Sequence, residues 1–191
     1  MLKESDFVEW GVKIDMSNYL PYFNLFLSEF NITTKNKLSC FFSNLLHESG
    51  NFYYKEEIAN GSAYENRKDL GNVNKGDGIK YKGLTFAQIT GRNNFRAFTK
   101  WCKLRYSDFD LNFEEFPRKT LDSKYCVLSS FWFWQVNNLS KYAETDFFSV
   151  CSIWNTGRIQ NPKSPHKING LQDRMDKFKI ISKWCDKNKI I

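Results

Sequence analysis

Apolar residues recur along most of the chain with the spacing of helices. The clearest run follows a polar break at Thr33 and Thr34, with apolar positions at i, i+3, i+4, i+7 and i+8: Leu38, Phe41, Phe42, Leu45 and Leu46. Threonine can cap the start of a helix, and Gly50 can supply the left-handed residue that ends it. We therefore expect an amphipathic helix between Thr34 and Gly50, with Glu48 in its last turn.

Other segments show helical patterns of the same kind. The stretch 126–136 is apolar on almost every side, which predicts a central, buried helix. Asp146 is placed to cap a helix that continues through Trp154. Three further stripes are Phe23, Leu27 and Phe30; Phe95, Phe98, Trp101 and Cys102; and Leu171, Met175, Phe178 and Ile181.

The pattern changes between residues 51 and 83. The apolar period disappears there, and glycines stand among charged, Asn and Tyr residues: Gly61, Gly71, Gly76, Gly78 and Gly83. Irregular loops much longer than ~15 residues are uncommon in compact domains unless they carry function. We predict a mainly α fold with one long glycine-rich loop, in which a short β-ribbon is the only candidate strand structure.

Composition fits one globular domain over residues 1–191, with no appended module. Of the 191 residues, 41% are hydrophobic and 17% aromatic, which is too apolar for a disordered chain. No run approaches the ~18 apolar residues of a membrane span. The first fifteen residues hold four acidic groups and no basic-then-apolar leader, so we expect a soluble product made in the cytoplasm.

Charge and cysteine usage narrow the chemistry further. The five cysteines are scattered singly and odd in number, which favours core thiols over disulfides. With only His47 and His166 as histidines and no Cys pair at ligand spacing, we expect no metal and no cofactor. A formal charge of +7 suits nucleic acid, an anionic cell wall or an acidic membrane alike, but no nucleic-acid-binding motif accompanies it.

Glu48 is the first candidate catalytic group. The negative end of the helix macrodipole and the neighbouring apolar stripe both disfavour its charged form. We therefore expect Glu48 to hold a proton near neutral pH, as the acid that cleaves a glycosidic bond must. A solvated glutamate at a helix end remains the alternative from this residue alone.

The residues around Glu48 strengthen the hypothesis that it is a catalytic acid. The residues His47-Glu48-Ser49-Gly50 resemble the H-E-[ST]-G segment of chitinases and endolysins in glycoside hydrolase family 19. In the shorter-loop members of that family the second catalytic carboxylate follows nine positions later, which corresponds to Glu57. Glu56 and Glu65 lie in the same loop and compete for this role, and only the family spacing favours Glu57.

Further strings follow in the family's order, over roughly residues 36–179. Residues 64–72 resemble Y-E-G-R-x-D-L-G-N, with Asn66 in place of the glycine, and residues 88–95 resemble Q-[IL]-[ST]-G-R-x-N-[YF]. The aromatic run 131–134, the segment 168–170 and the pair Asp173-Arg174 also match. The family's K-G-R-G is Lys-Gly-Leu-Thr at 82–85, which removes an arginine contact.

The resemblance implies a lysozyme-like, two-lobed helical domain with a substrate cleft. It implies inversion, with Glu48 as general acid, Glu57 as general base and Thr90 holding the attacking water; the two carboxyl groups would then lie ~6.5 to 9.5 Å apart. Arg174 is expected beside the base, and His47 in a structural hydrogen bond. The expected sugar contacts are Tyr81, Gln88, Asn94 and Asn169. Arg67 is expected as a further supporting residue.

Three functions compete at this point. The leading hypothesis is a phage-type endolysin, a lysozyme-like monomer that cuts the β-1,4 glycan of peptidoglycan in the cell wall or periplasm after release from the host cytoplasm. A chitinase is the enzymatic alternative, and a glycan-binding protein on the same scaffold is the non-enzymatic one. The basic stretch 177–189 could touch acidic envelope lipids, or it could simply close the core.

Overall fold

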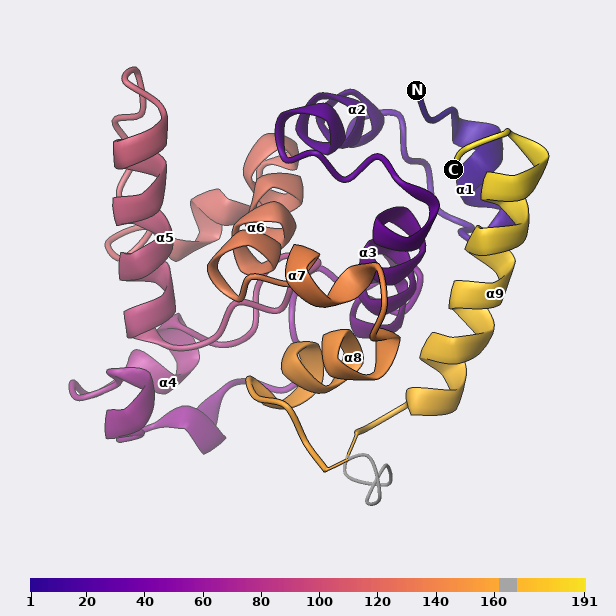
Figure 1. The fold of residues 1–191 in the computed structure, drawn as a ribbon. Helices are drawn as coiled ribbons and strands as arrows, with labels where there is room; N and C mark the ends of the chain where they lie inside the picture. Colours follow the sequence, from indigo (N-terminus) through magenta and orange to yellow (C-terminus); the bar gives the residue numbers. More distant parts are fainter. Residues whose placement is uncertain (162–167) are drawn as a thin grey trace. The chain divides into compact units, whose positions relative to one another are not determined.

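The structure, a computed structural model, describes residues 1–161 and 168–191 and divides them into two compact units (Figure 1). Unit 1 consists of residues 1–53 and 133–191, and unit 2 of residues 54–132. The fold is mainly α, as predicted. His166, expected in a loop, lies outside the described residues. That the chain forms one catalytic domain stays a prediction.

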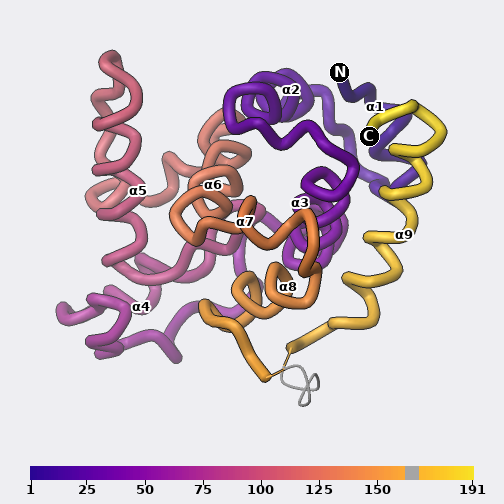
Figure 2. Tube along the Cα trace, in the orientation of Figure 1, coloured from indigo at the N-terminus to yellow at the C-terminus, as the bar shows by residue number. Residues whose placement is uncertain are grey.

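Unit 1 is built from helices at both ends of the chain. Figures 1 and 2 show α9 running alongside α3, and these two helices make the largest helix contact of the unit. Its helices are α1 (Glu4–Glu9), α2 (Leu20–Glu29), α3 (Lys35–Glu48), α7 (Ser140–Ala143), α8 (Phe147–Thr156) and α9 (Leu171–Lys187), together with the end of α6 (Ser123–Val136).

Helix α3 forms where its sequence predicts it. The Thr34 hydroxyl accepts the backbone N–H of Lys37 at 3.3 Å, which caps the first turn. The five apolar residues of the stripe are at most 4% exposed. The helix ends at Glu48, and Gly50 follows with a φ of +56°. The predicted helix is confirmed, and it leaves Glu48 at its C-terminus.

The remaining helices of unit 1 pack on α3. Rings of Phe7, Trp10, Phe23 and Phe42 form contacting pairs with centroids 4.8 to 5.9 Å apart. Asp146 caps α8 as predicted, because its carboxylate accepts the N–H of Ser149 at 2.9 Å. These contacts fix both faces of α3 and therefore its C-terminal end.

Helix α9 differs from its predicted stripe. Met175, expected in the core, is 38% exposed, whereas Arg174 is fully buried together with Ile181, Trp184 and Cys185. The other three residues of the predicted stripe, Leu171, Phe178 and Ile181, are half-buried or buried, so the stripe differs at one position, where the Arg174 guanidinium pairs with groups on α3. An apolar period cannot reveal this, since it assigns arginine to the surface.

Unit 2 holds the long loop and two long helical segments. Its elements are η1 (Ser62–Tyr64), η2 (Lys68–Leu70), α4 (Asp77–Lys80), α5 (Arg92–Arg105), η3 (Pro117–Leu121) and the first part of α6. Phe95 and Phe98 of α5 are buried as predicted. The expected β-ribbon is reduced to two isolated bridges, Glu56 with Leu84 and Leu84 with Ile89.

The long loop of unit 2 is held by charged groups. Arg92 donates to the buried carboxylate of Asp77 at 2.5 Å. Glu65 accepts the backbone N–H groups of Gly76 at 2.6 Å and Gly78 at 2.8 Å. A segment without an apolar period is thus fixed by polar contacts inside its own unit.

Two other expectations concern the core and the membrane. All five cysteines are free and buried, which confirms the prediction of core thiols. Within residues 1–161 and 168–191, none of the helices has both the length and the apolar character needed to cross a bilayer.

Candidate active site

Glu48 lies at the C-terminal end of α3 in unit 1, where a buried arginine holds it. Its side chain is 22% exposed, and the Arg174 guanidinium, 1% exposed, donates to Oε1. Arg174 also donates to Oδ1 of Asn44 at 2.8 Å and to the carbonyl of Asn169 at 3.2 Å. The carboxylate is therefore fixed in direction while part of it stays open to solvent.

This pairing corrects the expected position of Arg174. Arg174 was expected beside the general base, but it pairs with the candidate acid, Glu48. The reason is geometric: residues 44 and 48 are one turn apart on α3, and the first turn of α9 lies against that face. Whether Glu48 holds a proton near neutral pH stays a prediction.

The neighbouring His47 makes a second link between α3 and α9. Its Nδ1 lies 2.6 Å from a carboxylate oxygen of Asp173. Burial raises the pKa of Asp173, but hydrogen bonds from Lys177 and His47 outweigh it and lower that pKa. A Cβ on Gly170 would lie 1.9 Å from the imidazole ring, so only glycine fits there. His47 thus has the structural role expected of it.

Glu57 lies in unit 2, in the extended segment that enters the long loop. Its Oε1 accepts the hydroxyl of Tyr64 at 2.9 Å, and its Oε2 accepts the backbone N–H of Gly83 at 3.0 Å. A second bond joins its own N–H to the Gly83 carbonyl at 2.8 Å. Burial and the bond to Glu57 both raise the pKa of Tyr64, which keeps the hydroxyl a donor. The carboxylate is held by two neutral donors.

The structure separates the three carboxylates that compete for the base role. Glu56 pairs with Arg118 at 2.9 Å and Lys82 at 3.0 Å, and hydrogen bonds from these two groups lower its pKa to about 2. Both oxygens of Glu65 accept backbone N–H groups at the start of α4. A carboxylate with so low a pKa is a weak base. Among the described residues, Glu57 and Glu65 are both half-buried, fixed by neutral donors and without a salt bridge, but Glu65 holds the start of α4 whereas Glu57 lies beside Gly83.

Gln88 and Thr90 lie next to Glu57, on the turn after Gly83. A Cβ on Gly83 would lie 2.5 Å from Oε1 of Gln88 and 3.2 Å from Oε2 of Glu57, so this glycine lets the two side chains approach. The turn is strained, because Thr85 and Gln88 have φ values of +71° and +52°. The Thr90 hydroxyl donates to the Gln88 carbonyl at 3.0 Å. Unit 2 therefore brings together three of the predicted site residues.

The other predicted residues lie in more varied places. Exposed Asn94 donates to the Thr90 carbonyl at 2.8 Å, which keeps it beside that turn. Tyr81 is fully buried, and its hydroxyl donates to the Glu114 carbonyl at 2.7 Å. The expected sugar contact of Tyr81 is therefore replaced by a packing role. Arg67 is exposed and pairs with Asp69 at 2.5 Å.

Asn169 lies in unit 1, and its side chain is exposed. Its backbone N–H donates to Asn155 at 2.9 Å and its carbonyl accepts Arg174. Glu48 and Asn169 therefore share Arg174, while Glu57, Gln88, Thr90 and Asn94 belong to the other unit. The carboxyl separation expected between Glu48 and Glu57 stays a prediction.

Three contributors were missed by the sequence reasoning: Tyr64, Gly83 and Asn44. Tyr64 begins the Y-E-N-R string and Gly83 belongs to the Y-K-G string, so both positions were visible without a role attached. Asn44 gave no signal, because it lies on the helix that holds Glu48 but contacts Arg174 across 130 residues. In the part of the chain that the structure describes, no group of three His, Cys, Asp or Glu residues could hold a metal.

Comparison with known proteins finds a relative in sequence. The chain is 32% identical over 127 residues to a glycosyl hydrolase family 19 domain-containing protein of Haemophilus influenzae. The matched residues make up 66% of this chain and 54% of the relative. The chain thus spans about half the length of this curated relative. No family model matches the chain.

Solved structures share the fold. Chitinase C from Streptomyces griseus matches with a TM-score of 0.68 and 18% identity, over 94% of this chain and 76% of the chitinase chain. A class IV family 19 chitinase from Zea mays matches with a TM-score of 0.60 and 21% identity, over 100% and 83% of the two chains. These likenesses show that the chain shares the fold of these chitinases.

Proposed function

We propose that this chain is an inverting glycoside hydrolase that cleaves β-1,4 linkages in the glycan of bacterial peptidoglycan. The observation that carries the proposal is the setting of Glu57, whose two oxygens are oriented by Tyr64 and Gly83 beside Gln88 and Thr90. A base for glycoside hydrolysis needs a fixed, ionised carboxylate with room for water, and these neutral donors orient it without adding a positive charge.

The proposed reaction uses one water molecule and two carboxyl groups. Water attacks the anomeric carbon, Glu57 takes its proton, and Glu48 gives a proton to the leaving oxygen as the glycosidic bond breaks. Thr90 would hold the water, because its hydroxyl oxygen can still accept a hydrogen bond while donating to the Gln88 carbonyl. Arg174 would fix the direction of Glu48.

The substrate preference rests on the sequence. The Y-E-x-R-x-D-L-G-N string resembles that of bacterial and phage members, and a charge of +7 suits an anionic wall. The test compares loss of turbidity of purified peptidoglycan with release of soluble sugar from chitin, using the wild-type protein and Glu48→Gln. We expect clearing of peptidoglycan by the wild type only. Faster release from chitin would favour a chitinase instead.

The non-enzymatic alternative makes a different prediction in the same assay. A glycan-binding protein would co-sediment with peptidoglycan without producing reducing ends, and its variants at Glu48 and Glu57 would bind as the wild type does. Measured release of reducing ends that stops in Glu48→Gln argues against binding alone. Mass spectrometry of the released muropeptides then identifies which glycosidic bond is cut.

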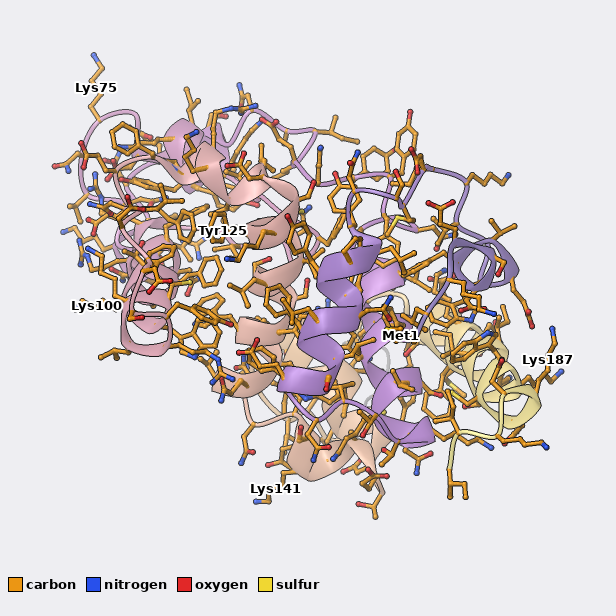
Figure 3. All side chains as sticks on the ribbon, turned by 90° about the horizontal axis from the view of Figure 1, so that it is seen from above. Met1, Lys75, Lys100, Tyr125, Lys141 and Lys187 are labelled. Carbon is orange, nitrogen blue, oxygen red and sulfur yellow. The ribbon has the colours of Figure 1, made fainter. Side chains whose placement is uncertain are left out.

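We further propose a monomeric, endolysin-type protein that is made in the host cytoplasm and acts on the wall after release. Contact of α9 with acidic envelope lipids would be weak, because several of its lysines already pair with carboxylates: Lys177 with Asp173, Lys179 with Asp176 and Lys187, at the surface in Figure 3, with Glu9. Light scattering after gel filtration tests the monomer, and co-sedimentation with anionic vesicles tests the contact.

A further inference from the structure

Unit 2 contains a pocket that the proposed reaction does not use. It measures about 730 Å³ and lies between the bridge at Leu84, helix α4 and the 3-10 helix η3. Its apolar lining consists of Leu84 and Pro117, which are buried, and Ile79 and Phe116, which are 59% and 56% exposed. Two large exposed apolar side chains in one concave site indicate a ligand with small apolar groups.

The rim of this pocket carries charges of both signs. Exposed lysines Lys80 and Lys119 and exposed acids Glu115 and Asp122 line it, next to the paired Glu56 and Arg118. An N-acetylated sugar chain has no charged group that would match these four side chains. A short peptide with carboxylates, an amine and methyl groups matches them, because each kind of group meets its opposite on the rim.

The pocket adjoins the candidate base. Glu56 lines the pocket and is the residue before Glu57, and Lys82 links the two, with its ammonium 3.0 Å from Glu56 and 3.1 Å from the Glu57 carbonyl. In an extended segment, successive side chains point to opposite faces. The pocket therefore lies on the other side of the segment that presents Glu57. A four-residue peptide spans roughly 13 Å when extended, which is enough to pass around one chain.

We propose that this pocket binds the stem peptide that peptidoglycan carries on alternate sugars. The inference rests on the proposed function and deepens it, because it makes the peptide substituent, which chitin lacks, a determinant of substrate choice. Phe116 and Ile79 would contact the methyl groups, Lys119 and Lys80 the carboxylates, and Glu115 and Asp122 the amine.

The test compares two soluble substrates: glycan chains with their stem peptides, and the same chains after enzymatic removal of the peptides. We expect kcat/KM of the wild type to be about tenfold higher on the peptide-bearing chains, the gain from burying one large apolar contact. Phe116→Ala and Lys119→Glu should bring this ratio to within about twofold and leave the rate on bare chains unchanged. Matched controls on α5 are Leu104→Ala and Lys100→Glu, whose exposed side chains do not line the pocket.

The possible outcomes distinguish the assignment of the peptide pocket from the proposed hydrolase function. Equal wild-type rates on both substrates, or equal losses on both in the pocket variants, would overturn the pocket assignment while the hydrolase stands. Failure to cut either substrate would overturn the proposed function. In that case, titration of a synthetic stem tetrapeptide, followed by NMR, still tests the pocket: binding that Phe116→Ala removes supports it, and no binding in the wild type refutes it.

Discussion

The two candidate catalytic carboxylates are held in opposite ways. Glu48 sits at the end of a regular helix and depends on Arg174, a buried residue 126 positions away on another helix. Glu57 sits in a loop without apolar period and depends on Tyr64 and Gly83, which are 7 and 26 positions away. The first is positioned by long-range packing of unit 1, the second by local contacts within unit 2.

This difference predicts different consequences of mutation. A buried arginine that loses its partner retains an uncompensated charge in the core, so changes at the Glu48 site should lower stability as well as activity. The donors to Glu57 are neutral and partly solvated, so changes there should act mainly on catalysis.

Replacing either carboxyl group by an amide should nearly abolish cleavage. We expect Glu48→Gln and Glu57→Gln each to lower kcat by about 10²- to 10⁴-fold, the usual contribution of a positioned acid or base. Their unfolding free energies should differ, with Glu48→Gln losing roughly 1 to 3 kcal/mol and Glu57→Gln less than about 1 kcal/mol. Urea unfolding and initial rates on glycan chains measure both. Similar stabilities for the two variants would contradict the contrast.

Removing the arginine tests the long-range support of Glu48. Arg174→Leu leaves Glu48 and Asn44 without their donor, and we expect it to cost about 3 to 5 kcal/mol of unfolding free energy. Arg174→Lys keeps the charge and should recover part of that stability but not the forked geometry. Thermal unfolding by circular dichroism distinguishes the three proteins. An unfolding temperature of Arg174→Leu equal to that of the wild type would mean that the packing of α9 does not depend on the Arg174–Glu48 pair.

Removing one donor from Glu57 tests the local support. Tyr64→Phe deletes the hydroxyl at 2.9 Å, and we expect kcat to fall by about tenfold, while stability changes by about 1 kcal/mol. Tyr22→Phe, at a half-buried position on α2 in unit 1, is the matched control. A drop in stability with unchanged kcat would assign Tyr64 to packing alone.

The smallest effect is expected at Glu56, which is paired and not catalytic in this account. Its pKa is lowered from 4.5 to about 2, so its pairing stabilises the fold above pH ~4.5 and is lost as the pH falls towards 2. Because the pair is partly exposed, we expect Glu56→Gln to cost roughly 1 kcal/mol at pH 6 and nothing near pH 2, with kcat little changed. Unfolding curves across this pH range check the sign. A large loss of kcat at neutral pH would instead return Glu56 to the catalytic candidates.

Features that depend on local contacts could be predicted from the sequence, and features that depend on long-range packing could not. The regular helices were predictable, because caps such as Thr34 and Asp146 and stripes such as that of α3 are local. The burial of Arg174 in place of Met175 was not predictable, because it depends on Arg174 contacting Asn44, which is 130 positions away in the chain. An arginine in the core has no signature in an apolar period.

The candidate site was only partly predictable. Spacing alone preferred Glu57 over Glu56 and Glu65, and the cationic partners of Glu56 add a physical reason against Glu56. Burial of Tyr81 could not be read from the sequence, because a tyrosine beside a glycine-rich loop suits a sugar contact and a core position equally well. Motifs therefore selected the candidate residues, while tertiary contacts showed which groups hold each of them; their catalytic roles stay predictions.

The anomeric form of the newly made end tests the central claim most directly. In the proposed reaction, Glu57 activates a water molecule while Glu48 protonates the leaving oxygen, which inverts the anomeric carbon. Proton NMR of bare β-linked glycan chains, recorded in the first minutes after adding the wild-type protein, should show the α-anomer appearing before mutarotation. Initial formation of the β-anomer would mean retention, and would remove Glu57 from the role of base.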